Sequence, residues 1–280
     1  MPGIAEKIQT FCADLEQTCM SMVKIAMLSK SIAQPPHADK GSEMVILGNG
    51  PSLRPMIETK RNFLEGKSLL AVNFAVQSDY FTQLKPKYYV VADPAFFANK
   101  EYCARLIDNM TEKTDWEMDF YTSALSRKVG DWQEKLSKNQ HIHVHYFNMT
   151  PVEGFRWFKH LCYRKGWGMP RPRNVLIPSI MLALSMGYDT IYVAGADHSW
   201  LKEVWVNDDN MVMEDLHHFY DKKGSQEYKS DKHLHDLLLS MSIAFRSYHV
   251  IKDYAETIGK KIINVTEGSY IDAFERKKIE

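Results

Sequence analysis

The 280-residue sequence has few cysteines and no cysteine motif. Its cysteines are scattered and contain no CxxC pair; they are Cys12, Cys19, Cys103 and Cys162. This pattern argues against a zinc module and against a disulfide-stapled secreted domain. The sequence also lacks a run long and apolar enough to span a membrane, and it lacks the apolar core of a signal peptide. We therefore expect a cytoplasmic protein.

An excess of charge of either sign is absent as well. Lys and Arg number 35, as do Asp and Glu, so the formal net charge is +0. Without a global basic field, nucleic acid is not an expected partner, and any site for an anion must be local. The apolar and charged fractions, 45% and 25%, are those of a folded globular protein.

Familiar catalytic and metal-binding motifs are missing. The sequence contains no HExxH, no GxSxG, no kinase signature and no P-loop lysine. His141, His143 and His145 lie on one face of an expected strand, but alternate strand residues are about 6.8 Å apart and do not converge easily on one ion. The acidic stretch 207–210, NDDN, is interpreted as a surface turn. We expect no resident metal.

An amphipathic helix is predicted over the first thirty residues. Apolar residues recur there at helical spacing, at Ile4, Ile8, Phe11, Leu15, Met22 and Ala26. This stripe could dock on the body of the protein, on a second subunit or on the inner face of a membrane, and the mixed charge of the polar face favours protein. A Pro- and Gly-containing linker follows, so we divide the chain into a helix and linker, 1–40, and a main domain, 41–280.

Beyond the linker, short β-rich runs alternate with helical patterns. Expected strands are Met44–Leu47, Ser68–Asn73, Tyr88–Ala92, Met118–Tyr121, His141–Phe147, Thr190–Ala194 and Lys261–Val265. The clearest expected helices are Pro178–Met186 and His233–Ile258. Alternating apolar strands and helices predict an α/β fold, a Rossmann-like, doubly wound and mostly parallel sheet with helices on both faces.

Polar or glycine-rich residues follow four of the expected strands. Gly48-Asn49-Gly50-Pro51-Ser52 ends the first, Asn73 the second, Asp93 the third, and Gly195-Ala196-Asp197-His198 a later one. Ligands of such sheets bind beyond the carboxyl ends of the strands, so these residues predict one binding rim. Asp93 has an alternative interpretation, as a turn or cap residue.

The glycine loop has two interpretations. Gly48 and Gly50 let the backbone approach a ligand, and Pro51 suits the first turn of a following helix, whose free N–H groups favour an anion. The loop would then be a phosphate cradle. The alternative is a tight strand-to-helix turn that binds nothing.

A second candidate contact lies between residues 171 and 200. Arg171, Arg173 and Asn174 precede a helix expected to start near Ser179, which suits an anion. Asp197 and His198 form a candidate acid–base pair, because His titrates near neutrality. In the alternative interpretation, Asp197 caps the next turn and His198 packs against Trp200.

A long connection precedes the last helix and carries His217, His218 and Tyr220. Long loops in compact α/β domains are often functional lids. A lid over the rim could supply a base and a phosphate contact. An ordinary solvated loop is the alternative.

These residues resemble one superfamily. The motifs ILGNGPSL, an Asn-ending second strand, RNVLIPSIMLALSMGYDTIYVAGADHSW and a His-containing segment before the final helix recur there in this order. The superfamily includes bacterial sialyltransferases that use CMP-sialic acid, flagellin-modifying motility accessory factor glycosyltransferases, and 6-hydroxymethylpterin pyrophosphokinase-like proteins. The resemblance covers the chain from about Glu43 onward.

The resemblance implies roles for individual residues. By this resemblance to the sialyltransferases, the glycine loop and Asn73 would line a CMP pocket, with Asn49 and Ser52 nearest the nucleotide. Asp93 falls where that family has an Asn, and Ser179 falls near its nucleotide-contacting Ser. His198 stands where that family is rich in tyrosine. By order along the chain, His217 or His218 would therefore be the base and Tyr220 the tyrosine that steadies the phosphate.

The resemblance implies a sialyltransferase-like glycosyltransferase that moves a nonulosonic acid from a CMP-sugar to a glycan or glycoprotein acceptor. Such transfer inverts the sugar and needs no metal, because helix N-termini and hydroxyl groups can stabilise the departing phosphate. One alternative is a pterin pyrophosphokinase that uses ATP, with magnesium held by Asp93 and Asp197. Another is a nucleotide-binding family member without catalytic activity.

Overall fold

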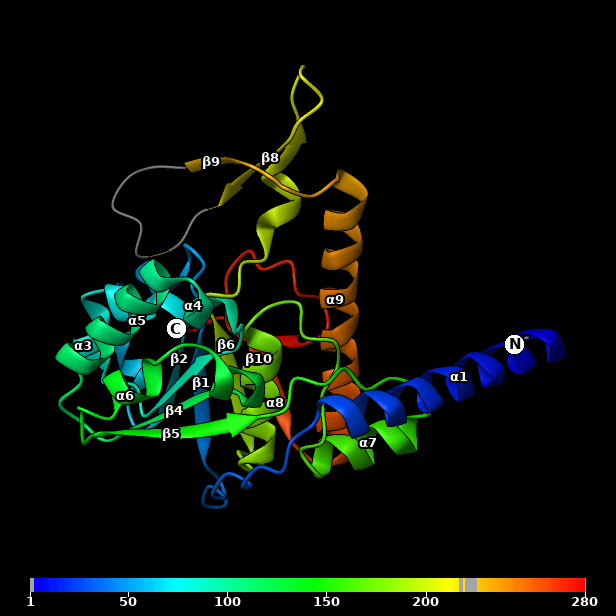
Figure 1. Cartoon of the computed structure of the whole chain (residues 1–280), viewed down its shortest axis with the longest axis horizontal. Helices are drawn as coiled ribbons and strands as arrows, with labels where there is room; N and C mark the ends of the chain where they lie inside the picture. Colours follow the sequence, from blue (N-terminus) through cyan, green and yellow to red (C-terminus); the bar gives the residue numbers. More distant parts are fainter. Residues whose placement is uncertain (1–2, 217–218, 220–225, 280) are drawn as a thin grey trace.

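The computed structural model describes residues 3–216, 219 and 226–279 (Figure 1). Its centre is an eight-stranded sheet in the order β11-β10-β6-β1-β2-β3-β4-β5. Every neighbouring pair in it is parallel. The strands are β1 (Glu43–Leu47), β2 (Ser68–Val72), β3 (Tyr88–Val91), β4 (Met118–Ser123), β5 (Ile142–Phe147), β6 (Thr190–Ala194), β10 (Lys261–Asn264) and β11 (Glu275–Arg276). The predicted α/β fold is confirmed.

Helices cover both faces of this sheet. The longer ones are α5 (Lys100–Lys113), α7 (Arg156–Arg164), α8 (Leu176–Ser185) and α9 (Leu234–Thr257). Shorter ones are α2 (Leu53–Thr59), α3 (Tyr80–Leu84), α4 (Ala95–Ala98), α6 (Trp132–Leu136), and the 3₁₀ turns η1 (Arg61–Leu64), η2 (Asn73–Gln77), η3 (Ala124–Lys128) and η4 (Ser199–Lys202). One hydrophobic core packs the sheet on α7, α8 and α9, and the other packs it on α2, α3, α5 and α6.

The strand order reverses between β1 and β6. From β1 the chain adds β2 to β5 on one side, and β6 then pairs with β1 on its other side before β10 and β11 follow. At such a reversal the connections leave the two strand ends in opposite directions and open a crevice. The glycine loop, which follows β1, therefore faces the loop that follows β6.

A second, smaller sheet stands above the strand ends, where the long connection is predicted. Its strands are β7 (Val204–Val206), β8 (Val212–Leu216) and β9 (Gln226–Lys229), paired antiparallel. Figure 1 shows it beside the N-terminal end of α9. The stretch 207–210 turns between β7 and β8, as predicted. The expected loop is therefore partly a sheet. β7 is a run of only three apolar residues, and β8 contains Glu and Asp, so neither reads as an apolar strand of the main sheet.

The N-terminal helix α1 (Ile4–Leu28) forms as predicted. It meets the body near its middle, where the Thr18 hydroxyl accepts a hydrogen bond from the Phe155 N–H at 3.0 Å and the Ser21 hydroxyl donates to the Glu153 carbonyl at 3.1 Å. In Figure 1 the half that precedes this contact extends away from the sheet. None of the described helices is long and apolar enough to cross a membrane.

Candidate functional site

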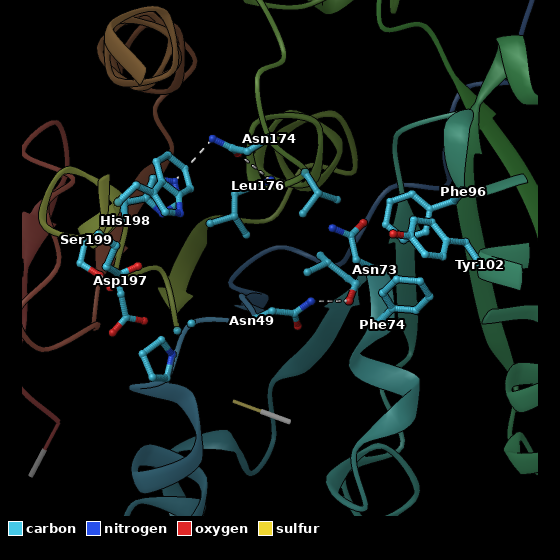
Figure 2. A pocket seen from close by; sticks show the side chains of 17 residues that line it. Asn49, Asn73, Phe74, Phe96, Tyr102, Asn174, Leu176, Asp197, His198 and Ser199 are labelled. Atoms are coloured by element: carbon cyan, nitrogen blue, oxygen red, sulfur yellow. Dashed lines mark hydrogen bonds between the residues drawn. The ribbon is translucent and has the colours of Figure 1, made fainter. Parts of the chain in front are cut away.

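A cavity of about 360 Å³ opens at the reversal point of the sheet, between the ends of β1, β2 and β6. Figure 2 shows two groups of side chains facing each other across it. One group, the β6 wall, consists of Gly195, Asp197 and His198. The other, the aromatic wall, consists of Phe74, Phe96 and Tyr102. The predicted binding rim therefore corresponds to a cavity, which contains Asn49, Gly50, Pro51, Asn73, Gly195, Asp197 and His198 of the expected residues.

The Asp197 carboxylate of the β6 wall is bonded to the glycine loop. It accepts hydrogen bonds from the Ser52 hydroxyl at 2.8 Å and from the Ser52 N–H at 3.3 Å. Burial raises the pKa of the Asp197 carboxyl above its usual value, and the bonds from Ser52 oppose this rise. A carboxylate thus occupies the position at the start of α2 where an anion was expected.

The glycine loop is a turn in which the N–H groups of Gly48, Gly50 and Ser52, and of Leu53 after it, donate to protein oxygens. The Gly48 N–H donates to the Ala194 carbonyl at 2.7 Å, the Gly50 N–H to Gly195 at 2.9 Å, and the Leu53 N–H to Gly50 at 3.1 Å. Helix α2 begins at Leu53, so Pro51 precedes it instead of lying in its first turn. The expectation of a phosphate cradle is wrong for the N–H groups of Gly48, Gly50 and Ser52, because protein oxygens accept from them.

The glycines are needed for close approach of two backbones. A Cβ on Gly195 would lie 2.6 Å from the Gly48 carbonyl oxygen and 2.8 Å from Leu53 Cβ, and Gly195 has φ +64°. A Cβ on Gly50 would overlap the Asp197 carboxylate. The loops after β1 and β6 therefore pack as one unit that only glycine permits.

His198 lies in a buried hydrogen-bond network from three elements. Its Nε2 is 2.7 Å from the Tyr248 hydroxyl of α9, and that hydroxyl donates to Asn174 Oδ1 at 3.0 Å. Asn174 Nδ2 also lies 3.5 Å from His198 Nε2, so this ring nitrogen faces both an amide donor and the Tyr248 hydroxyl. The imidazole is stacked on Trp200, with ring centroids 4.1 Å apart. The alternative interpretation of His198, as packed against Trp200, describes this contact.

The His198 side chain is 7% exposed. Burial lowers the pKa of its imidazole to about 3, so the ring is neutral at physiological pH. A neutral imidazole has one nitrogen without a proton, which can accept a hydrogen bond. It is a weak base, however, because its protonated form is disfavoured by burial.

Asn174 also caps α8 (Leu176–Ser185). Its Oδ1 accepts from the Leu176 N–H at 3.0 Å and from the Ile177 N–H at 3.3 Å. The helix therefore starts before the predicted Pro178. Ser179 is fully buried inside it, and its hydroxyl donates to the Val175 carbonyl at 2.8 Å. The expected nucleotide contact of Ser179 is wrong for this reason.

The aromatic wall lies at the far end of the cavity in Figure 2. The Phe74 ring is 4.9 Å from that of Phe96 and 5.7 Å from that of Tyr102, measured between centroids. The Arg105 guanidinium lies 4.9 Å from the Phe74 centroid. Asn73, where β2 turns into η2, has φ 49°, a left-handed conformation that asparagine tolerates. This turn presents both Asn73 and Phe74 to the cavity.

Asn49 contributes an unused acceptor between the two walls. Its Nδ2 donates to the Val72 carbonyl at 3.2 Å, which fixes the amide. Its Oδ1 is buried and has no hydrogen-bond partner among the described residues. A buried unpaired oxygen is costly, so a ligand donor at this place would be stabilised.

Other expected residues lie outside the cavity. Asp93 is exposed, and its Oδ1 accepts a hydrogen bond from the Ala95 N–H at 2.9 Å. This contact agrees with its alternative interpretation as a turn residue. Gly48 and Ser52 lie behind the lining, and they shape the loop. His217, His218 and Tyr220 fall outside the described residues. Phe219, which lies between His218 and Tyr220 in the sequence, is described, and its N–H donates to the Asn49 carbonyl at 3.0 Å.

His141, just before β5, and His143 and His145 within it have carboxylate partners. His141 and His143 contact the two oxygens of Glu117 at 2.8 Å and 2.6 Å, and His145 contacts Asp119 at 2.8 Å. Within the described parts of the chain, no three His, Cys, Asp or Glu side chains are placed to hold a metal ion.

No protein-family model matches the sequence, and no curated protein sequence matches it. Among solved structures, the chain is similar to the MAf glycosyltransferase from Magnetospirillum magneticum AMB-1, with a TM-score of 0.51 and 11% sequence identity. The two chains share a fold. The match covers 94% of this chain and 38% of that one, so this chain spans well under half the length of its structural neighbour.

The aromatic wall is the part of the site that the sequence patterns missed. Phe74 directly follows the expected strand-end residue Asn73, so the sequence indicated that it lies near the binding rim. Phe96 and Tyr102 follow Asp93 at no diagnostic spacing, and only the turn after β3 brings them to Phe74. Aromatic residues after a strand are more often core residues, which hides such a wall.

Proposed function

We propose that this protein is a glycosyltransferase whose cavity binds the nucleotide of an activated sugar. The observation that carries the proposal is the pairing, at the reversal point of the sheet, of an aromatic wall with the unpaired oxygen of Asn49. Aromatic rings stack on a base, and a fixed amide oxygen can accept from the exocyclic amino group of a base. The activity named for the structural neighbour supports the same class of reaction.

The proposed donor is a CMP-activated nonulosonic acid, and the proposed acceptor is a glycan or glycoprotein. Cytosine carries the exocyclic amino group that Asn49 Oδ1 would accept from. We propose an inverting transfer without a metal, in which a base removes the acceptor proton as the CMP phosphate leaves. The buried, weakly basic His198 suits positioning, and we assign the base to His218 or His217, with Tyr220 at the phosphate.

The choice of His218 rests on its neighbour in the sequence. Phe219 is bonded through its N–H to the Asn49 carbonyl. Its own carbonyl accepts from the Arg54 guanidinium at 2.7 Å. The chain is therefore anchored at the glycine loop one residue after His218.

The pyrophosphokinase alternative requires carboxylates that share a magnesium ion. Asp197 lines the cavity, whereas Asp93 is bonded to the Ala95 N–H outside it. We therefore do not extend the proposal to that reaction.

Calorimetric titration with CMP, UMP and ATP, each with and without magnesium, tests the proposal. We expect CMP to bind without magnesium. Asn49→Ala should weaken CMP binding about tenfold, since it removes a ligand acceptor. His218→Ala should keep CMP affinity and abolish transfer from a CMP-sugar. Binding of ATP only with magnesium would overturn the donor, and full activity of His218→Ala together with His217→Ala would overturn the base.

A further inference from the structure

The N-terminal half of α1 carries an apolar face that the rest of the described chain leaves exposed. The exposed fractions are 80% for Ile4, 59% for Ile8, 56% for Phe11 and 47% for Leu15. The Phe11 ring contacts the Phe155 ring of the body, with centroids 5.3 Å apart. In Figure 1 this half of the helix projects beyond the other elements. Such a contiguous apolar face marks an interaction surface.

The character of the face changes where α1 reaches the body. The next positions on the inner side are Thr18 and Ser21, both buried, and their hydroxyls bond to the backbone of Glu153 and Phe155. Gly154 makes this contact possible, since a Cβ there would overlap Thr18. Hydroxyl residues therefore serve the contact within the chain, and of the large apolar residues before them Phe11 adds a ring contact with Phe155 while it stays 56% exposed.

The spacing of the apolar residues is that of a coiled coil. Ile4, Ile8, Phe11 and Leu15 follow one another at intervals of four, three and four residues, the alternation of d and a positions in a heptad. The residues flanking this seam on one side are small, Ala5 and Cys12, and those on the other side are charged, Lys7 and Asp14. The outward positions are Glu6, Gln9, Thr10, Ala13, Glu16 and Gln17. This pattern predicts a helical partner.

We propose that this half of α1 pairs with the same half of α1 in a second copy of the chain, as a short antiparallel two-helix coiled coil with a twofold axis. Antiparallel pairing places Ile4 opposite Leu15 of the second copy, and Ile8 opposite its Phe11. All the exposed seam residues are then covered in one register. The interface is isologous and closed, as in most homodimers.

The charges select the antiparallel orientation. In the register that pairs the seam, Lys7 of each copy faces Asp14 of the other, which gives two opposite-charge pairs across the axis. The small residues Ala5 and Cys12 face each other on the other side and let the helices approach. In a parallel pair, Lys7 and Asp14 would instead flank the small residues, without charged partners.

A lipid surface fits this helix less well. Between residues 4 and 17 the charged side chains are Lys7 against Glu6, Asp14 and Glu16, so the segment is acidic. Helices that lie on anionic membranes carry lysine and arginine on the polar face. Charge therefore favours a second copy of the chain.

Sedimentation velocity over a range of concentrations tests the pairing. The full chain is expected to show a concentration-dependent monomer–dimer equilibrium. Phe11→Asp should give a monomer at every concentration, because it buries a charge in the seam. The matched control is Gln9→Asp, which adds the same charge on the outward face and should leave the equilibrium unchanged. Circular dichroism checks that both variants keep their helix content. A wild-type chain that stays monomeric, or a dimer that survives Phe11→Asp, overturns the proposal.

Charge reversal tests the orientation. Lys7→Asp and Asp14→Lys should each weaken the dimer about tenfold, because each replaces two opposite-charge pairs by two like-charge pairs. The double variant should recover wild-type affinity, and a mixture of the two single variants should form a mixed dimer. Equal affinity of all four proteins overturns the antiparallel register.

A cross-link gives a readout independent of affinity. Ala5→Cys, oxidised mildly, should form a covalent dimer through Cys12 of the second copy, since these small positions face each other. Ala5→Cys combined with Cys12→Ser is the control and should remain uncross-linked. Flotation with anionic vesicles completes the set, and a monomer that binds vesicles through Phe11 overturns the proposal in favour of lipid.

Discussion

The β6 wall and the aromatic wall of the cavity differ in how their side chains are held. Asp197 and His198 of the β6 wall are bonded to Ser52 and Tyr248, and both approach the cavity from a sharply turned backbone. Phe74, Phe96 and Tyr102 of the aromatic wall are in ring contact with one another, and Tyr102 is 42% exposed. The first wall is held by hydrogen bonds, whereas the second consists of ring contacts and is partly exposed.

This difference separates stability from binding. A change in the β6 wall removes hydrogen bonds or creates overlap in a packed region, so unfolding free energy should respond first. A change in the aromatic wall removes a stacking surface and should act on ligand affinity.

Gly195→Ala should have the largest effect. It places a Cβ 2.6 Å from the Gly48 carbonyl oxygen at a residue with φ +64°, and overlap together with backbone strain should lower the unfolding free energy by about 3 kcal/mol. Urea denaturation of the wild type and of the variant measures this loss of unfolding free energy. The control is Gly259→Ala, which has φ +70° with open space around it, and should cost only the strain, about 1 kcal/mol. Equal costs would contradict the close packing of the two loops.

His198 should make stability depend on pH. Its folded pKa, about 3, lies below the unfolded value near 6.5, so protonation favours the unfolded chain and stability is lost as pH falls below 6.5. This residue alone should lower the unfolding free energy by about 1.4 kcal/mol between pH 7.5 and pH 5.5. Urea midpoints of the wild type and of His198→Gln at both pH values isolate the effect. An identical pH dependence in the two proteins would mean that His198 protonates freely in the folded state.

Tyr102→Ala should act on binding instead of stability. It removes one stacking surface from the aromatic wall, so the Kd for CMP should rise about fivefold, or ~1 kcal/mol. The melting temperature should change little, because the ring is partly exposed. Calorimetry and thermal melts measure the two quantities. Leu125→Ala, a comparably exposed apolar residue on η3, should change neither. A large loss of stability without loss of affinity would assign Tyr102 to the core.

Asp93→Ala should have the smallest effect. The carboxylate bonds the Ala95 N–H outside the cavity, so its loss should cost about 0.5 kcal/mol and leave the Kd for CMP unchanged. The same calorimetric and urea experiments apply. Weaker CMP binding in this variant would mean that Asp93 contributes to the binding site.

Most of the fold could be predicted because its signals are local. Apolar β-rich runs such as Thr190–Ala194 reported the strands, and α1 and α9 followed from helical spacing over long windows. The strands β8, β9 and β11 were missed because they contain charged residues, whereas predicted strands of similar length such as β2 are apolar runs. β7 was missed because it has only three residues.

The site was predicted at its strand ends and missed elsewhere. Asn49, Asn73 and His198 follow strands directly, so a parallel sheet brings them together. Ser179 was misplaced because α8 starts earlier, at a cap that Asn174 provides. The binding partners of a backbone N–H or a carboxylate come from distant segments, and no pattern near Ser52 indicates that Asp197 bonds to it.

By itself, the sequence determined the kind of sheet, the edge of the sheet that holds the cavity, and the seam on α1, because period and strand-end chemistry are written in neighbouring residues. Only the tertiary structure decided what the glycine loop does. In MVILGNGPSL a phosphate cradle and a filled turn look alike. Packing of Gly48 against Gly195, with Asp197 on Ser52, occupies the N–H groups of Gly48, Gly50 and Ser52. Asn49 and the aromatic wall line the cavity beside these packed loops.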